Sequence, residues 1–299
     1  MDRKSQPVLV TGASSGIGRA TAERLASSGH PVFAGARREE DLGAFGHLPN
    51  VVPLKLDVTR NEDAERAVAK IREHGRGLFG LVNCAGLGNA GPIAEMTVED
   101  LHDVMDVNLD GAHRMVHSVF PLLRAARGRV VNISSIGGFL VEPMMGPYNI
   151  SKHAVEGYSD VLREELAPLG IRVVTVSPGS FRTNIFENGL RRFGGTIRTR
   201  WVESDSVYRE QVLQLLRYLE QPGVRSRAQY PPPTAVAAAI EEALDADAPR
   251  NRYLVATSEE ADLVFDRIFL LVHELNDSRA DPLTPEALVE RLTKARPRA

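Results

Sequence analysis

Short apolar runs alternate with amphipathic segments along most of the chain. Seven runs rich in Val, Ile and Leu have the length and β-branched content of buried strands. They lie at 7–11, 31–36, 51–56, 78–82, 128–134, 171–176 and 252–256. The segments between them have helical spacing; in 61–73, for example, Ala64, Val68 and Ile71 fall on one face. Strands that alternate with helices predict a parallel sheet with ligands bound at the carboxyl ends of its strands.

This pattern predicts an α/β fold: a single doubly wound Rossmann-type domain, 1–299, with a central parallel seven-stranded sheet and helices on both faces. The alternation stops at Asn184, and residues 184–230 form an arginine- and glycine-rich segment followed by an amphipathic one. We interpret this insertion as a substrate lid with Gly194 and Gly195 as hinges. Residues 257–299 are expected to form a C-terminal helical extension, with helices at 259–275 and 285–294.

A long helix is expected over 97–119, with Thr97 as its N-cap and an acid three residues later. Asn108 lies in its middle, where Asn is a mediocre helix former, so its amide is either in use or merely packed or exposed. His113 and His117 are four residues apart on this helix. No third ligand is evident in the sequence, so we expect no metal site.

Composition narrows the class of protein. With 299 residues and 43% hydrophobic content the chain can bury a substantial core. A net charge of −3 argues against a surface for nucleic acid. We expect no signal peptide, and the apolar run at 268–272 is far too short for a membrane span. Cys84 is the only cysteine, which excludes an internal disulfide and favours the reducing cytoplasm; we interpret it as a small buried hydrophobe.

A glycine-rich turn connects the first strand to the first helix. Its candidate cofactor residues are Gly12, Ser14, Ser15, Gly16, Ile17 and Gly18. Glycines permit a tight turn and a close backbone approach to a pyrophosphate, which the free N–H groups and dipole of the helix N-terminus attract. The alternative is a plain turn between strand and helix; the position after a first strand favours a nucleotide site.

The second strand ends at Arg37 and Arg38, where a dinucleotide fold meets the adenosine ribose. No acid follows until Glu39, so we predict a preference for NADP(H) over NAD(H). The alternative is that both arginines are solvated strand-end charges. Further candidate cofactor residues follow the third and fourth strands: Asp57, Val58, Asn83, Ala85 and Gly86.

Ser135, Tyr148 and Lys152 are the candidate catalytic group. If a helix begins near Gly146, Tyr148 and Lys152 lie one turn apart on the same face. An ammonium beside a phenol stabilises the phenolate and lowers its pKa from about 10, which suits proton transfer near neutral pH. Ser135, at the end of the fifth strand, would offer a second hydroxyl to the same substrate oxygen.

Together these motifs resemble the short-chain dehydrogenase/reductase family, and more loosely its hydroxysteroid and retinol dehydrogenase branch. The matches are Thr11 to Gly18 for TGxxxGxG, Asn83 to Gly86 for NxAG, the mid-helix Asn108, and Ser135, Tyr148 and Lys152. The resemblance implies that Tyr148 delivers the proton and that Tyr148 and Lys152 also contact the cofactor. It implies that Asn108 anchors a water, that Pro178, Gly179, Phe181 and Thr183 hold the nicotinamide side, and that the protein is a homodimer or homotetramer.

Large apolar residues near the catalytic group suggest a bulky apolar substrate. The candidates are Phe139, Met144, Met145 and Phe186; the alternative is that they belong to the core. Two other functions stay open. One is reduction of an acyl-thioester ketone whose phosphates meet Arg191 and Arg192. The other is a non-catalytic NADP-binding regulatory protein.

Overall fold

The computed structural model describes residues 5–46, 48–75, 77–221 and 229–295, apart from the side chains of Ala44 and Phe186. The segment 222–228, which belongs to the predicted lid, lies outside the described residues. The side chain of Phe186, a predicted substrate contact, lies outside them too.

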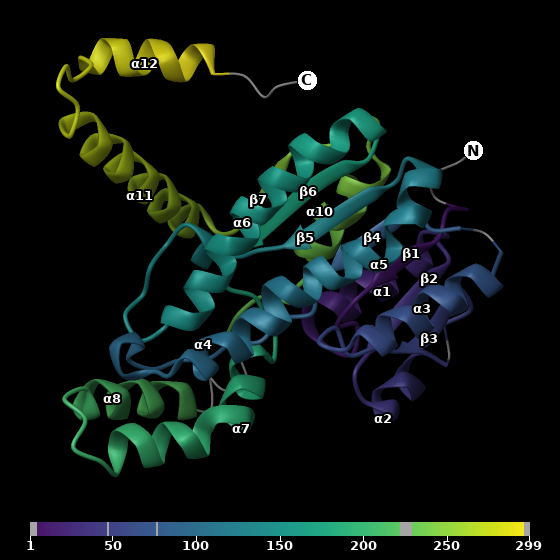
Figure 1. Cartoon of the computed structure of the whole chain (residues 1–299), viewed down its shortest axis with the longest axis horizontal. Helices are drawn as coiled ribbons and strands as arrows, with labels where there is room; N and C mark the ends of the chain where they lie inside the picture. Colours follow the sequence, from purple (N-terminus) through teal and green to yellow (C-terminus); the bar gives the residue numbers. More distant parts are fainter. Residues whose placement is uncertain (1–4, 47, 76, 222–228, 296–299) are drawn as a thin grey trace.

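The described residues form a parallel sheet of seven strands, which confirms the predicted fold class (Figure 1). Its spatial order is β3-β2-β1-β4-β5-β6-β7. The strands are β1 (Val8–Val10), β2 (Val32–Ala36), β3 (Val51–Lys55), β4 (Gly80–Asn83), β5 (Arg129–Ile133), β6 (Arg172–Pro178) and β7 (Arg252–Val255). The strand order reverses between β1 and β4, and a crevice for ligands is expected at the carboxyl ends of the strands there.

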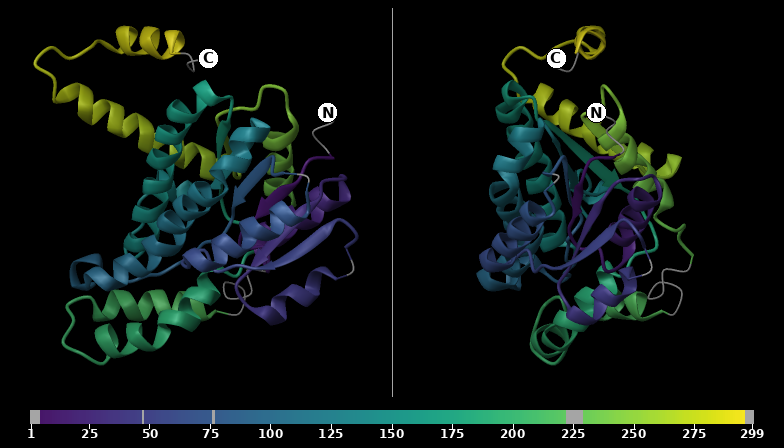
Figure 2. Two further views of the ribbon diagram at one scale, coloured as in Figure 1. Left: turned by 45° about the vertical axis from the view of Figure 1, so that its right-hand side comes forward. Right: turned by 90° about the vertical axis from the view of Figure 1, so that its right-hand side faces the viewer.

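Helices cover both faces of the sheet, and alternate residues of each strand serve the two faces (Figure 2). Val8 and Val10 pack with α1 (Gly16–Ser27) and α10 (Thr234–Asp245). Leu9, between them, belongs to the other cluster, with α3 (Asn61–Glu73), α5 (Gly111–Ala126) and α6 (Gly146–Leu166). Two separate apolar layers therefore enclose the sheet. Strands β1, β2, β4 and β5 are buried along their whole length, whereas the edge strands β3 and β7 are partly exposed. Helix α10 begins directly after Pro233, which is its N-cap residue.

The helix predicted over 97–119 is three consecutive pieces. These are α4 (Val98–Met105), a π-helical turn η4 (Asp106–Asp110) and α5, which continues to Ala126. The predicted capping box is present, because Thr97 and Asp100 exchange hydrogen bonds at the start of α4. Asn108 lies in the middle of the π-helical turn, a rare element that is frequent at functional sites.

The insertion after β6 folds back as two helices next to α4 (Figure 1). Helix α7 (Ile185–Ile197) continues into a π-helical turn η7 (Arg198–Val202), and α8 (Arg209–Glu220) follows. Gly194 and Gly195 lie inside α7, so the prediction that they are hinges is wrong. The insertion has its own apolar cluster, whose buried members are Leu87 from the body and Phe193, Ile197, Trp201, Val212 and Leu216; Met96, Val107 and Met144 of the body pack against it.

The C-terminal segment projects away from the sheet as two helices, α11 (Ser258–Asp277) and α12 (Pro285–Lys294) (Figures 1 and 2). A second capping box, Thr257 with Glu260, begins α11. Asn276 exchanges two hydrogen bonds with the backbone of Leu283 and so fixes the turn between the helices. Within the described ranges, no helix is long and apolar enough to cross a membrane.

Short helical turns complete the described chain. They are α2 (Glu39–Leu42), η2 (Gly43–Phe45), η3 (Ile93–Glu95), η5 (Ile136–Gly138) and η6 (Ala167–Leu169). Of these, η5 and α2 bear on the site, because η5 follows the candidate Ser135 and α2 follows the arginine pair.

Candidate active site

A cavity of about 470 Å³ lies at the carboxyl ends of the central strands. This volume is within the usual range for small-molecule sites. Its wall brings together the glycine-rich turn, the end of β2, the turns after β3 and β4, the start of α6, the loop after β6 and part of the insertion. The cavity thus collects most of the residues that the sequence singled out, from segments far apart in the chain.

The glycine-rich turn forms one end of the cavity, where Gly12, Ser14, Ser15, Gly16, Ile17 and Gly18 all line it. Gly12 and Gly16 have φ values of +63° and +55°, which side chains disfavour. A Cβ on Gly18 would lie 2.3 Å from the carbonyl oxygen of Gly12, so the turn packs directly on α1. The first turn of α1 contains no acidic residue, which leaves its N-terminus suited to an anion.

The two arginines after β2 have different surroundings. Arg37 lines the cavity. Arg38 does not; it donates two hydrogen bonds to Asp41, both 2.9 Å, and these raise the pKa of its guanidinium. Glu40 also pairs with Arg38, and Glu39 pairs with Lys55 across 3.4 Å. The acids of this turn are therefore occupied by other cations, and Arg37 is the arginine that faces the cavity.

The turns after β3 and β4 provide small and polar surfaces. Asp57, Val58, Ala85 and Gly86 line the cavity. One carboxylate oxygen of Asp57 accepts hydrogen bonds from the amide and hydroxyl of Thr59, at 3.0 and 2.8 Å. Asn83 does not line the cavity. Its amide donates to the side chain of Asn132 on the neighbouring strand at 2.9 Å, so it connects β4 to β5.

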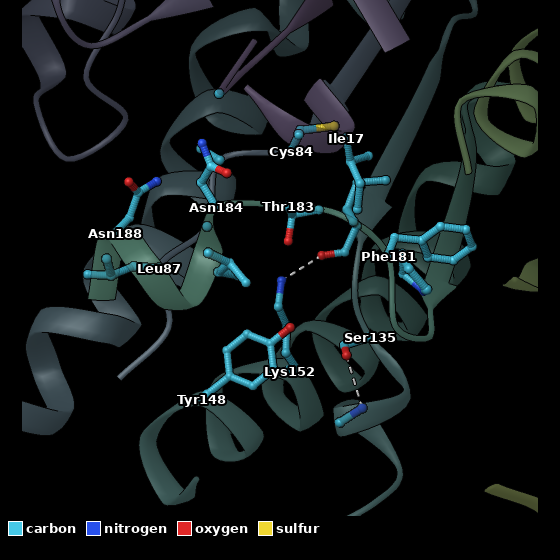
Figure 3. Close-up of a pocket in the computed structure, with 18 of the residues that line it drawn as sticks. Ile17, Cys84, Leu87, Ser135, Tyr148, Lys152, Phe181, Thr183, Asn184 and Asn188 are labelled. Carbon is cyan, nitrogen blue, oxygen red and sulfur yellow. Dashed lines mark hydrogen bonds between the residues drawn. The ribbon is translucent and has the colours of Figure 1, made fainter. Parts of the chain in front are cut away.

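Ser135 and Tyr148 both lie on the wall of the same cavity (Figure 3). Ser135 follows β5 in an extended conformation, and its Oγ accepts a hydrogen bond from the Gly137 amide at 3.1 Å. A Cβ on Gly137 would lie 3.3 Å from Cε1 of Tyr148 and 3.5 Å from Oγ of Ser135. Both side chains therefore meet at Gly137, and the absence of a side chain there leaves room for the Tyr148 ring.

Lys152 lies one turn after Tyr148 and is buried, with 4% of its surface exposed. Its ammonium donates a hydrogen bond to the carbonyl of Ile133 at 2.8 Å and lies 5.8 Å from the Tyr148 ring centre. Burial lowers the pKa of Lys152 from 10.5 to about 8, although Glu156 opposes this shift. Burial also raises the pKa of the nearby Cys84 thiol to about 12, which keeps it neutral and unsuited to a nucleophilic role.

The Asn108 side chain connects the turn after β4 to α6. Its Oδ1 accepts from the Leu87 amide at 2.7 Å, and its Nδ2 donates to the Leu87 carbonyl at 3.0 Å and to Oγ of Ser151 at 2.8 Å. Ser151 in turn donates to the Tyr148 carbonyl at 2.7 Å. The amide of Asn108 therefore uses its donors in hydrogen bonds, which was one of the two alternatives given above; the other was a residue that is merely packed or exposed. The water relay implied by the family resemblance stays a prediction.

The loop after β6 closes the other side of the cavity. Pro178, Gly179, Phe181 and Thr183 line it, as does Ser180. Thr183 approaches the glycine-rich turn: a Cβ on Gly16 would lie 3.3 Å from Thr183. The residues that the family resemblance assigns to the nicotinamide side therefore face the turn assigned to the pyrophosphate.

The predicted substrate contacts need correction. Met145 lines the cavity, but Phe139 and Met144 do not. Phe139 ends the short helix η5, and Met144, with φ at +67°, packs against the apolar cluster of the insertion. Leu140 takes their place on the wall. The insertion was expected to cover the substrate, but of its residues on the wall only Arg192 was named from the sequence as a candidate contact. Residues of this part that line the cavity are Asn184, Ile185, Asn188, Arg192, Leu215, Tyr218, Leu219 and Tyr230.

These features fit a phosphorylated dinucleotide. The glycine-rich turn and the N-terminus of α1 suit a pyrophosphate, and Arg37 suits a phosphate at one end. Tyr148, Lys152 and Thr183 lie at the part of the cavity where a nicotinamide is expected from the family resemblance. In the described part of the chain, no group of three or more His, Cys, Asp or Glu is placed to hold a metal ion, and His113 contacts Tyr158 instead, at 3.2 Å.

Comparisons with known proteins agree with this geometry. A family model described as short chain dehydrogenase matches residues 6–191. The chain is 38% identical to the mitochondrial D-beta-hydroxybutyrate dehydrogenase of Rattus norvegicus over 68% of its own length, but it spans only 62% of that relative. It is 36% identical to the NADPH-dependent 3-dehydrocapnine reductase of Ornithobacterium rhinotracheale, covering 83% of this chain and 87% of the relative. Retinol dehydrogenase 16 of Mus musculus is also 36% identical, over 82% and 79% of the two chains.

Solved structures show the same fold. A short-chain dehydrogenase from Streptomyces avermitilis matches with a TM-score of 0.74 and 30% identity, over 91% of this chain and 95% of that one. A Burkholderia cenocepacia dehydrogenase in complex with NADP has a TM-score of 0.64 at 26% identity, over 91% and 98%. A Burkholderia phymatum enzyme in complex with NAD has a TM-score of 0.72 at 26% identity, over 95% and 99%. Neighbours of this fold therefore hold either cofactor.

Proposed function

We propose a function from one premise: the chain belongs to the short-chain dehydrogenase family and is therefore an oxidoreductase. The specific proposal is an NADP(H)-dependent enzyme that transfers hydride between the nicotinamide and a carbonyl or secondary alcohol of a bulky apolar substrate, such as a steroid-, retinoid- or polyketide-like molecule. One observation carries it. Ser135, Tyr148 and Lys152 line the same cavity as the glycine-rich turn and Arg37.

Ser135 and Tyr148 would act on the substrate oxygen. When bound, the cofactor would supply the hydride to the carbonyl carbon, and negative charge would develop on the oxygen. The Ser135 hydroxyl and the Tyr148 ring lie on either side of Gly137, which supports a role for the two hydroxyls as donors to that oxygen; such preorganised donors usually contribute several kcal/mol to lowering a barrier. Tyr148 then delivers the proton, and in the reverse direction it accepts one from the alcohol.

Lys152 would set the state of Tyr148 rather than contact the substrate. Its ammonium lies 5.8 Å from the Tyr148 ring centre and favours the phenolate. Because its own pKa is about 8, the charge that performs this role is present below that pH and is lost above it. The hydrogen bond to Ile133 holds the ammonium in place while it does so.

Arg37 supports a preference for NADP(H). A guanidinium on the cavity wall suits the 2′-phosphate, whereas NAD-specific folds place an acid there to accept from the ribose hydroxyl. The acids of this turn instead pair with Arg38 and Lys55. NADPH dependence of one relative is consistent with this proposal.

The substrate end of the cavity supports an apolar substrate. Leu140, Met145, Leu215 and Leu219 contribute aliphatic surface to it. An acyl-thioester ketone is the second candidate substrate, and Arg192 on the wall is its only support. Arg192 already pairs with Asp103 at 3.1 Å, so the apolar substrate is the better supported of the two.

We also propose that the protein forms a homodimer or homotetramer and acts in the cytoplasm, with the insertion as a substrate lid. The family resemblance supports the assembly, and the single cysteine supports a reducing compartment. We likewise propose catalytic roles for Asn108, Ser135, Tyr148 and Lys152.

The decisive experiment measures NADPH oxidation with a panel of bulky ketones, for the wild type and for Tyr148→Phe. The wild type should turn over at least one ketone, and loss of the hydroxyl should lower kcat by about 10²- to 10⁴-fold, the usual contribution of a general acid. The variant should still bind NADPH, since only one hydroxyl is removed. Binding of NADPH without turnover of any ketone by the wild type would instead favour the non-catalytic regulatory protein.

A further inference from the structure

The first turn of α11 is joined to the loop after β6 by one carboxylate. Oε1 of Glu260 accepts a hydrogen bond from the Ser180 amide at 2.8 Å. Its other oxygen, Oε2, accepts from the amide and the hydroxyl of Thr257 at 3.0 and 3.3 Å. The same side chain therefore completes the capping box of α11 and holds a backbone amide 80 residues earlier in the chain.

The contact between Glu260 and the Ser180 amide requires a glycine at position 179. A Cβ on Gly179 would lie 2.2 Å from Oε2 of Glu260, so any side chain there would displace the carboxylate. The Gly179 amide also donates to the Val255 carbonyl of β7 at 2.8 Å. Two consecutive amides of the loop, those of Gly179 and Ser180, are thus fixed by the end of β7 and by the first turn of α11.

Glu260 is charged at neutral pH. Burial alone would raise the pKa of its carboxyl, but the hydrogen bonds from Thr257 and Ser180 outweigh that effect and lower the pKa below its usual value. The bond to Ser180 is therefore a charge-assisted one, which is roughly twice as strong as a neutral bond.

The loop that this carboxylate holds is part of the cavity. Gly179 and Ser180 both line it, together with Phe181 and Thr183. A loop that must be ordered upon binding weakens the affinity for its ligand, so a loop fixed in advance strengthens it. The effect should be confined to the part of the ligand that touches this loop.

We propose that Glu260 is a positioning residue for the nicotinamide half of the cofactor: by fixing the Pro178–Thr183 loop from outside the cavity, it preorganises the surface on which that half binds. This inference rests on the proposed function, because the loop matters in this way only if a nicotinamide cofactor binds here. It assigns the C-terminal extension a part in cofactor binding, through its first turn.

The test compares two ligands on the full-length protein by calorimetry. One is NADPH, and the other is 2′-phospho-ADP-ribose, which has the adenosine half and both bridging phosphates but no nicotinamide. Glu260→Ala should weaken NADPH about tenfold, the order expected for one lost charge-assisted hydrogen bond, and should change the fragment's affinity less than twofold. Glu260→Gln, which keeps an acceptor for Ser180, should recover part of the loss and serves if the alanine variant fails to fold.

Two matched controls separate positioning from helix stability. Thr257→Ala removes the cap hydroxyl and its bond to Oε2 of Glu260, but leaves the bonds of Glu260 with the Thr257 and Ser180 amides. It should therefore lower the melting temperature with little change in the ratio of the two affinities. Glu259→Gln removes the charge of the exposed neighbouring residue and should change neither quantity.

Equal weakening of both ligands by Glu260→Ala, or an unchanged ratio, would overturn the inference while leaving the proposed function intact. If the wild type bound neither NADPH nor the fragment, the proposed function itself would fail, and the inference with it. A selective loss of NADPH affinity that Glu260→Gln partly restores is the outcome that supports it.

Discussion

Replacement of Asn108 by Ala tests whether this side chain is a structural connector as well as a candidate catalytic residue. The substitution removes three hydrogen bonds, two with the Leu87 backbone and one with Ser151. Leu87 is 7% exposed and Ser151 is fully buried, so water replaces these partners poorly. At about 1 kcal/mol for each bond, we expect a loss of about 3 kcal/mol in the free energy of unfolding.

This loss should appear in thermal unfolding and in turnover together. For chains of about 150 to 250 residues, a decrease of about 3 kcal/mol lowers the melting temperature by roughly 6 to 12 °C. The shift becomes smaller as the chain becomes longer, so for this protein we expect a value in the lower part of that range. Because Ser151 also holds the Tyr148 carbonyl, kcat should fall by about 10- to 100-fold even though Tyr148 and Lys152 are intact. Asn108→Asp should destabilise as much, since it places an oxygen against the Leu87 carbonyl in place of a donor.

Asn188→Ala is the matched control for stability, because it removes an amide that lines the cavity and has no hydrogen bond to another described side chain. It should change the unfolding free energy by less than about 0.5 kcal/mol. Ser151→Ala removes two bonds, those with Asn108 and with the Tyr148 carbonyl, and should cost about 2 kcal/mol. Only the bond with Asn108 is shared, so the double variant should lose about 1 kcal/mol less than the sum of the two single variants. An Asn108→Ala variant with wild-type stability and no activity would refute the connector and favour the water relay alone.

Three further predictions concern the cofactor end and the buried lysine. Arg37→Asp should raise the KM for NADPH far more than the KM for NADH; an unchanged ratio in steady-state kinetics would contradict the assignment of the 2′-phosphate to Arg37. The pKa of Lys152 is about 8 in the folded protein and 10.5 for the free side chain. Between these two pH values the unfolded chain binds more protons than the folded one, so the free energy of unfolding of the cofactor-free protein should increase from pH 8 to 10.5, by up to about 3 kcal/mol. Denaturant titrations of Lys152→Met should not show this increase in the free energy of unfolding. If the free energy of unfolding of the wild type and of the variant rose equally with pH, the prediction would be contradicted. Gly18→Ala should weaken NADPH by more than tenfold, since its Cβ would overlap the Gly12 carbonyl oxygen, and a fluorescence titration with wild-type affinity would exclude that overlap.

The strands and their assembly into one parallel sheet followed from the sequence because parallel strands are apolar on both faces. Val8, Leu9 and Val10 are all fully buried, and such runs stand out between turns. Helix boundaries were clear where polar residues bracket a periodic segment, as in α3, whose ends match the predicted ones. The seven strands differ from prediction only at their ends.

The long helix and the insertion could not be derived in the same way. A π-helical turn around Asn108 adds one residue to a single turn, and a search for a 3.6-residue period passes over it. The pair Gly194 and Gly195 suggested a hinge because glycine weakens isolated helices, but the surrounding apolar cluster with Phe193 and Ile197 stabilises α7 through it.

Most candidate residues on short motifs line the cavity, Asn83 being an exception, whereas candidates that depend on long-range packing were predicted less well. Tyr148 and Lys152 are one helical turn apart, so their geometry follows from α6 alone. Phe139 and Met144 were chosen for their closeness to Tyr148 in sequence, which says nothing about the direction of side chains in a loop. Leu215 and Leu219 reach the same cavity from α8, about 70 residues later, and only tertiary structure brings them there.

The separate apolar cluster of the insertion bears on how this protein can change its substrate during evolution or in the laboratory. Phe193, Trp201 and Val212 pack within α7, η7 and α8, while the sheet has its own two layers. Replacements on the cavity side of these helices are therefore expected to alter the choice of substrate while sparing the layers that hold the glycine-rich turn and Tyr148. Leu87 is the exception, because it belongs to that cluster and also bonds Asn108. A library of new specificities should vary the two helices and keep Leu87 fixed.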